Sequence, residues 1–133
     1  MPLFLAYCPD RIGPDVLETR LRVRSEHFQG FKQTVQEGHA EFGRGFRPHP
    51  DSHLFAPENL ALLPEGVEPM AGSVMLLRYD TLEEAWDRVR RDVYWTANVW
   101  DHNRLILEQF CEPPPAGTVP GVEDAAGVGT GKA

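Results

Sequence analysis

The 133-residue sequence lacks the features that mark several large classes of protein. No apolar run approaches the ~18 residues needed to span a bilayer, and the short N-terminal run lacks the basic flank of a secretory signal. Basic residues are in the minority: 13 Lys and Arg stand against 20 Asp and Glu, a net charge of −7. We therefore expect no nucleic-acid partner and no membrane partner, because both favour a concentrated basic surface. Cys8 and Cys111 form no metal-binding or redox spacing, so we expect two free thiols in a cytoplasmic protein.

Aromatic residues are missing from the end of the chain. All 13 lie between Phe4 and Phe110, whereas nine of the residues 111–133 are Pro or Gly. Such a stretch buries too little apolar surface to offset its ordering entropy. The sequence thus predicts one domain over residues 1–110 and a flexible tail over residues 111–133.

Four short stretches predict β-strands, at residues 3–8, 40–46, 73–79 and 105–110. The first and third carry apolar residues on both faces, and the second is punctuated by Gly43 and Gly45. Residues 47–72 contain five prolines and show weak periodicity. A connection of that length is typical of a functional loop or lid.

Two helices are predicted between these strands. The first, over residues 15–35, is either continuous or restarts near Ser25, and it stops at Gly38. Its apolar stripe at helical spacing consists of Leu17, Leu21, Phe28, Phe31 and Val35. The second begins with a capping box from Thr81 to Glu84. Its apolar stripe consists of Leu82, Ala85, Trp86 and Val89.

The order β-α-β-β-α-β predicts an α+β fold, a ferredoxin-like sandwich with two helices on one face of a four-stranded sheet. The other face of such a sheet is open. Since the first and third strands are apolar on both faces, something must cover the open one. The simplest cover is the same face of a second copy, in a two-fold homodimer.

Four segments of the chain form a recognisable set. They are Leu5-Ala6-Tyr7-Cys8-Pro9-Asp10, Arg24-Ser25-Glu26-His27-Phe28, Gly72-Ser73-Val74 with Leu82-Glu83-Glu84-Ala85, and Asp92-Val93-Tyr94 with Asn98-Val99-Trp100-Asp101. Over residues 2–110 the chain resembles the YCII-related (YciI-like) family of dimeric α/β-barrel proteins. Ser25 and Val93 stand where members of that family usually have proline.

The resemblance implies a dimer and a cleft that contains a His–Asp pair, which the matching motifs place at His27 and Asp92. Most members of the family have no known activity. One characterised relative is a dehydrochlorinase of a chlorinated hydroxyhydroquinone, and neighbouring families of the same fold include muconolactone isomerases and small monooxygenases. This analogy favours small aromatic or lactone-like substrates.

The residues themselves leave the roles of these side chains open. His27, near an apolar helix edge, is either structural or a general base that Asp92 orients. Arg24, on the same side of the helix, would hold a substrate carboxylate or phenolate, or else pair with an acid such as Glu41.

Two further groups are ambiguous. Four aromatic residues would line an apolar pocket or belong to the core or the dimer interface: Tyr7, Tyr94, Trp95 and Trp100. Among them, Tyr7 and Tyr94 are candidate substrate-binding residues. His49, Asp51 and His53 alternate in the Pro-rich loop, where they are either metal ligands or solvated polar residues, and we expect no metal site.

We therefore expect a small enzyme that needs no cofactor and performs His–Asp general acid/base chemistry on a small aromatic or lactone-like metabolite. Isomerisation, elimination and hydrolysis are all compatible with these residues. The alternative is a dimeric module that binds a small ligand, or serves as an accessory, without turnover.

Overall fold

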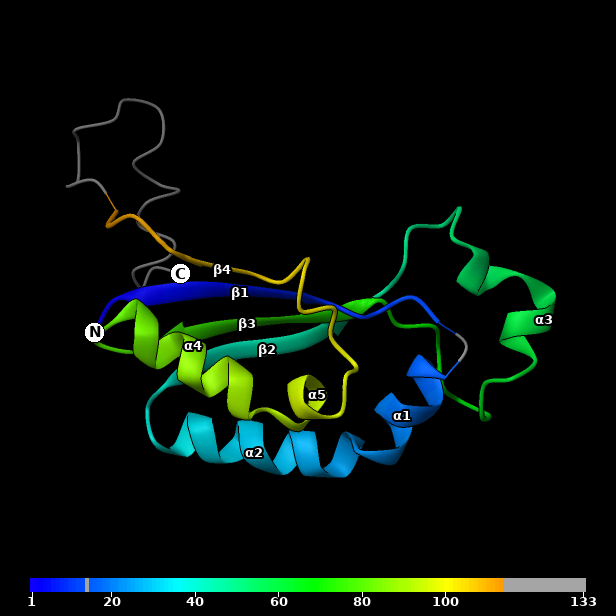
Figure 1. The fold of residues 1–133 in the computed structure, drawn as a ribbon, viewed down its shortest axis with the longest axis horizontal. Helices are drawn as coiled ribbons and strands as arrows, with labels where there is room; N and C mark the ends of the chain where they lie inside the picture. Colours follow the sequence, from blue (N-terminus) through cyan, green and yellow to red (C-terminus); the bar gives the residue numbers. More distant parts are fainter. Residues whose placement is uncertain (14, 114–133) are drawn as a thin grey trace.

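The computed structural model describes residues 1–13 and 15–113, so most of the predicted tail lies outside the described residues. Four strands form one antiparallel sheet in the order β2-β3-β1-β4. The strands are β1 (Leu3–Pro9), β2 (Ala40–Phe46), β3 (Gly72–Arg78) and β4 (Ile106–Gln109). The helices that cover one face are α1 (Val16–Arg22), α2 (Arg24–Gln36), α4 (Leu82–Arg91) and α5 (Val93–Thr96), as Figure 1 shows. This is the predicted ferredoxin-like α+β architecture.

The two central strands alternate between a buried and an open face. On the helix side, Phe4 and Ala6 of β1 pair with Leu77 and Met75 of β3, and all four are at most 1% exposed. On the other side, Leu5, Tyr7, Val74 and Leu76 are only partly buried or exposed. The sheet therefore has the second apolar face that the sequence predicts.

The first predicted helix is broken. Val23 ends α1 and precedes α2, so the restart lies at Arg24 and Ser25 is not the cap. The predicted inward stripe is also wrong, because Phe28 and Val35 are 55% and 45% exposed. The buried residues of the two helices are instead Val16, Arg20, His27 and Thr34.

The inward face is thus rotated by one residue from the apolar stripe, and it is largely polar. Burial of polar groups is tolerated where each one finds a partner, and these side chains do so in the site described below. Phe31 alone of the predicted stripe in α2 packs against the core.

The second predicted helix, α4, has the expected capping box, with the Glu84 N–H donating to the Thr81 hydroxyl. Ala85 and Val89 are fully buried. Leu82, in contrast, is 45% exposed at the first position of the helix, so its predicted place in the core is wrong.

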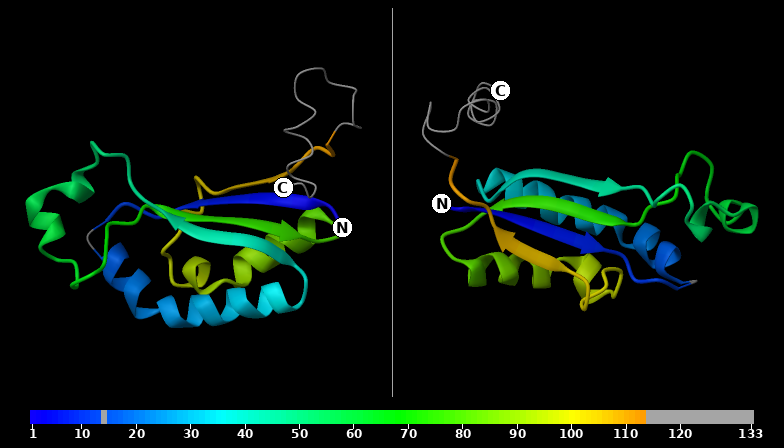
Figure 2. Two further views of the ribbon diagram at one scale, coloured as in Figure 1. Left: turned by 180° about the vertical axis from the view of Figure 1, so that it is seen from behind. Right: turned by 90° about the horizontal axis from the view of Figure 1, so that it is seen from above.

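The long connection between β2 and β3 contains two short helices, a 3₁₀ turn at His53–Phe55 and α3 (Pro57–Leu60). It extends beyond the end of the sheet, next to α1 (Figures 1 and 2). Among the described residues, no helix is long and apolar enough to cross a membrane.

Candidate active site

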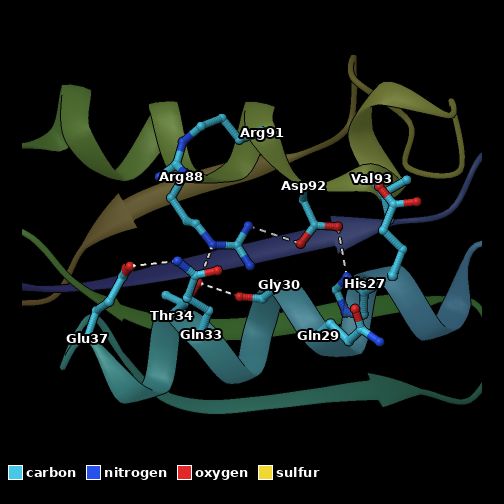
Figure 3. A pocket seen from close by; sticks show the side chains of 11 residues that line it. His27, Gln29, Gly30, Gln33, Thr34, Glu37, Arg88, Arg91, Asp92 and Val93 are labelled. Atoms are coloured by element: carbon cyan, nitrogen blue, oxygen red, sulfur yellow. Dashed lines mark hydrogen bonds and ion pairs between the residues drawn. The ribbon is translucent and has the colours of Figure 1, made fainter.

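The structure brings His27 and Asp92 together. His27 lies on the inward face of α2, and Asp92 lies at the junction where α4 ends and α5 begins. The imidazole Nδ1 and the carboxylate Oδ1 are 2.8 Å apart (Figure 3). His27 is 9% exposed and Asp92 4%. The pair therefore joins α2 to the junction of α4 and α5.

Asp92 is held by two further donors. The N–H of Tyr94 donates to Oδ1 over 2.9 Å, which makes the carboxylate the N-cap of α5. Arg88 donates from Nη1 to Oδ2 over 3.0 Å, and its Nε donates to the Thr34 hydroxyl over 2.7 Å. Arg88 therefore links α4 to α2 beside the pair, as Figure 3 shows. In the sequence it stood out only as a cation near a helix C-terminus.

Asp92 is an anion at neutral pH despite its burial. Burial alone raises the pKa of Asp92 and is the largest single influence on it. The hydrogen bond from His27, the charges of His27 and Arg88, and the Tyr94 N–H together outweigh burial and hold the pKa below the ordinary value for aspartate. A carboxylate can only accept a hydrogen bond, so Nδ1 of His27 carries the proton. When the ring is neutral, Nε2 is then the basic nitrogen, and protonation of Nε2 gives the charged form.

Aromatic packing fixes the orientation of this ring. The imidazole stacks on Tyr94, with ring centroids 3.9 Å apart and planes at 14°. Trp100 meets it edge-on at 6.1 Å. Trp100 is fully buried and its Nε1 donates to the Ser73 hydroxyl, so it belongs to the core. The hydrogen bond at Nδ1 and these two aromatic neighbours together hold the imidazole in a single orientation.

A cavity of about 260 Å³ lies beside the ring, between α2 and the sheet; we call it the arginine cavity. Its lining includes Arg20, Arg24, His27 and Tyr94, and no acidic residue of the described chain lines it. Within the described residues Arg24 makes no ion pair, and its guanidinium carbon lies 5.2 Å from the Phe28 ring centroid. Glu41, the alternative partner of Arg24, pairs with Arg78 instead. The cavity therefore offers a cation that can accept an anionic group.

Two glycines of β2 let side chains of the cavity wall lie directly against the strand. Gly43 and Gly45 face the helices from β2, opposite Met75 and Ser73 of β3. A Cβ atom on Gly43 would collide with the Phe31 ring, and one on Gly45 would collide with the Met70 methyl group. The sequence showed these glycines only as punctuation of a strand, whereas in the structure Phe31 and Met70 occupy the space that larger residues there would need.

Arg20 is a second buried cation at the cavity, and it is already neutralised. Its Nε lies 3.3 Å from Oδ2 of Asp10, and its Nη2 donates to the Gly72 carbonyl and the Ser73 hydroxyl over 3.0 Å each. Its guanidinium carbon also lies 4.6 Å from the Tyr94 ring centroid. Burial raises the pKa of Asp10 to about 6, although the nearby arginines lower it in part. Neither Arg20 nor Asp10 had been singled out from the sequence.

The remaining candidate residues lie elsewhere. Tyr7 is on the open face of the sheet, where its ring stacks on Phe46 with centroids 5.4 Å apart, and it lines a different cavity of about 340 Å³. Trp95 stacks on His102 near the surface. Of the predicted substrate-binding residues, the structure thus places Arg24 and Tyr94 with His27, and it places Tyr7 apart from them.

The alternating loop residues do not converge. His49 and Asp51 are 76% and 93% exposed, and the Asp51 N–H donates to the His49 ring in a local turn. Within residues 1–13 and 15–113, no three His, Cys, Asp or Glu side chains are grouped so as to hold a metal ion. Cys8 faces the core, where burial raises the pKa of its thiol and so suppresses the thiolate.

No protein-family model and no curated protein matches the chain. Among solved structures, the chain is similar to 5-chloro-2-hydroxyhydroquinone dehydrochlorinase from Burkholderia phenoliruptrix, determined in complex with 2,5-dihydroxybenzoquinone. The match has a TM-score of 0.60 and 19% sequence identity, and it covers 83% of this chain and 94% of the other. The two chains share a fold. It is the ferredoxin-like α+β fold, and the likeness at this identity extends to the fold alone.

Proposed function

We propose that the protein is a YCII-like enzyme that transfers protons to and from a small aromatic or lactone-like metabolite, without a cofactor, by means of His27 and Asp92. One observation carries the proposal above all. A buried histidine, oriented by a buried carboxylate, lines a cavity that has unpaired positive charge and no acid among its described residues. That arrangement suits a general base acting on a substrate that becomes an anion.

In the first step, Nε2 of His27 accepts a proton from an acidic C–H or O–H group of the substrate. The electron pair left behind is delocalised onto a substrate oxygen, which Arg24 stabilises through charge-assisted hydrogen bonds. Asp92 stabilises the imidazolium that results. Return of the proton to another atom gives an isomerisation, and departure of a leaving group with its electron pair gives an elimination. Hydrolysis of a lactone begins differently: Nε2 takes the proton from water, the hydroxide adds to the lactone carbonyl, and Arg24 stabilises the resulting oxyanion. The ring C–O bond then breaks, and the leaving oxygen takes the proton back from His27.

The size and chemistry of the arginine cavity support a single-ring reacting group. Its volume of about 260 Å³ lies just below the ~300–1,000 Å³ range of small-molecule sites, which suits a small ligand. Phe28 and Phe31 supply apolar contacts, and Arg24 supplies the cation. A phenolate or an aromatic carboxylate matches this combination. The dehydrochlorinase of the same fold was determined in complex with 2,5-dihydroxybenzoquinone, a ligand with a single six-membered ring, which agrees with the proposal.

We further propose that the working form is a homodimer joined through the open face of the sheet. Leu5 and Leu76 lie opposite each other at its centre, and Phe42 and Ile106 at its edges are 43% and 46% exposed. An apolar face of this kind marks an interface. Sedimentation should therefore show a dimer for the wild type and a monomer for Leu76→Glu. Gln36→Glu, on the exposed side of α2, introduces the same single charge and should leave the dimer intact.

Turnover in deuterated water tests the catalytic proposal. The protein would be incubated with 5-chloro-2-hydroxyhydroquinone, hydroxylated benzoates and aromatic lactones, and NMR would follow both conversion and deuterium incorporation. We expect His27→Ala to lower the rate by about 10²–10⁴-fold. His102→Ala should leave the rate unchanged, because His102 is exposed and contacts Trp95 rather than the cavity. A His27→Ala variant with full activity would refute the mechanism, and binding without any turnover would favour the non-catalytic module.

A further inference from the structure

We infer that the arginine cavity is one end of a longer cleft, that the side chain of Met70 forms the partition within it, and that the substrate is an aromatic anion bearing an apolar substituent. The inference rests on the proposed function, because it extends the same cavity. It adds that the substrate carries an apolar substituent and that Met70 selects for this substituent.

A second cavity of about 380 Å³ lies beyond Met70; we call it the arm cavity. Apolar side chains from the loop before α1, from α1 and from the connection between β2 and β3 form much of its lining: Ile12, Leu17, Leu54, Leu62 and Leu63. His53 and Asn59 also line it, and no Asp, Glu, Lys or Arg of the described chain does. Ile12 and Leu62 are each 75% exposed at this place. Exposed apolar surface around a cavity favours an apolar occupant.

Met70 lines both cavities. It lies shortly before β3, and its methyl group occupies the space over Gly45 where a larger residue would have a Cβ atom. The same side chain also lines the cavity that contains Tyr7, which shares Ile12, Leu17 and Leu54 with the arm cavity. One partly buried side chain therefore separates the cation and the base from a continuous apolar region.

Methionine suits a movable partition. Its side chain is unbranched and has three rotatable bonds, so it changes rotamer at low cost and adapts its shape to a neighbour. The residue beneath it is glycine, so the Met70 methyl group lies against the β2 backbone and meets no side chain at position 45. A ring held by Arg24 beside His27 would direct a linear substituent past Met70 and toward Leu54.

Charge complementarity identifies the occupant. The arginine cavity carries the positive charge and the arm cavity carries none, so a ligand with an anionic head and an apolar arm fits both together. A second copy of this chain is the rival occupant of the arm cavity, and the experiment below separates the two.

The test uses the full-length protein and three probes of one head and increasing arm length: 4-methoxybenzoate, 4-butoxybenzoate and 4-hexyloxybenzoate. Affinity would be measured by calorimetry. Each buried methylene should tighten binding by about fourfold, so that the butoxy probe binds at least about tenfold more tightly than the methoxy probe. Leu54→Asn should remove this gain and leave the affinity for 4-methoxybenzoate unchanged. Leu60→Asn is the matched control, because Leu60 is exposed on the same connection and lines neither cavity.

Methyl NMR of methionine provides a second measurement that does not depend on a variant. Met75 lines the arginine cavity only, Met70 lines both, and Met1 lies 55% exposed at the N-terminus as an internal control. All three probes should shift the Met75 signal, whereas the shift of the Met70 signal should grow with the arm. Met70→Leu and Met75→Leu assign the two signals.

The outcomes are distinct. If 4-methoxybenzoate does not bind, the arginine cavity is not a ligand site and the proposed function fails with the inference. If it binds but a longer arm brings no gain, or the Met70 signal responds equally to all three probes, the inference alone is overturned. A gain that vanishes as protein concentration rises would show that a second copy occupies the arm cavity, which also overturns it.

Discussion

Replacement of Asp92 by Asn removes one negative charge from the centre of the site and preserves the size of the side chain. The native carboxylate accepts hydrogen bonds from His27 and Tyr94 on one oxygen and from Arg88 on the other. An amide has one oxygen and one NH₂ group in the same places. Its NH₂ must therefore face either Arg88 or the His27 and Tyr94 donors, and a donor that faces a donor forms no hydrogen bond.

The cost is dominated by the charge left behind on Arg88. Arg88 is 4% exposed, and it also donates a hydrogen bond to the Thr34 hydroxyl, which carries no charge. Removal of one partner from a buried ion pair destabilises a protein by about 3–5 kcal/mol. Since domains of this size are stable by ~5–15 kcal/mol, the variant should lose roughly a third of its free energy of unfolding. Its Tm should fall by roughly 10–20 °C.

Urea unfolding at neutral pH, followed by circular dichroism, measures this loss. The matched control is Glu83→Gln on the same helix, because the Glu83 carboxylate is 74% exposed and pairs with Arg90 at 3.5 Å. An exposed pair of that kind contributes less than about 1 kcal/mol. If Asp92→Asn is as stable as Glu83→Gln, Asp92 does not compensate a buried charge and our reading of the site is refuted.

The same variant tests the pKa of Asp92. Because the folded-state pKa lies below the unfolded value of about 3.9, the unfolded chain binds a proton first as pH falls. The stability that the carboxylate contributes is therefore complete above pH ~4 and declines as the pH falls through the folded-state pKa. Unfolding curves recorded between neutral and acid pH should show this decline in the wild type, and the decline should be absent from the Asp92→Asn variant.

Three further predictions follow from burial and backbone geometry. Burial raises the pKa of Asp10 from 3.8 to about 6, so between these two pH values the folded state keeps a proton on Asp10 that the unfolded chain has released. The free energy of unfolding should therefore fall by ~3 kcal/mol as the pH rises from 4 to 6, and urea unfolding at a series of pH values should show that Asp10→Asn lacks this fall. Gly30→Ala, inside α2 with open space around it, should raise the free energy of unfolding by ~0.5–1 kcal/mol, whereas Gly43→Ala, against a phenyl ring, should lower it by ~1–3 kcal/mol. Ellman's reagent should modify the exposed Cys111 in the native protein and reach the buried Cys8 only after unfolding, and rapid modification of both thiols would contradict the packing of β1.

The elements with strong local signals were predictable from the sequence. A compact apolar run predicts β1 because the strand is central and its alternate residues enter the core. The capping box predicts the start of α4 because both of its hydrogen bonds join residues within four positions of each other. The short helix α5 was not predicted, since four residues carry too little periodicity to detect.

The inward face of α1 and α2 was mispredicted for a physical reason. Arg20, His27 and Thr34 are buried there, and each forms a hydrogen bond with a residue far along the chain: Ser73, Asp92 and Arg88, respectively. A prediction from the spacing of apolar residues places such a polar face in solvent. It then places the neighbouring apolar residues, including Phe28, in the core, although they are exposed in the structure.

The candidate site was predictable in part. His27 and Asp92 are 65 positions apart, so no local spacing relates them, and only the family resemblance paired them. The role of Arg88 had a readable signal, because it precedes Asp92 by one helical turn. The arginine cavity had no such signal, since its lining residues come from separate helices and strands that only the fold brings together.

The topology of the sheet has a consequence for synthesis of the chain. β1 is synthesised before the other three strands, yet its neighbours are β3 and β4, which begin only at Gly72 and Ile106 (Figure 2). At ~5–20 residues per second, the apolar N-terminal strand waits several seconds for its first partner. An unpaired apolar strand is prone to aggregation during that interval, and it is the kind of segment that chaperones protect. Translation that stops before β3 is complete therefore leaves a chain whose most apolar strand has no place to pair, and such chains should depend on chaperones and proteases for their removal.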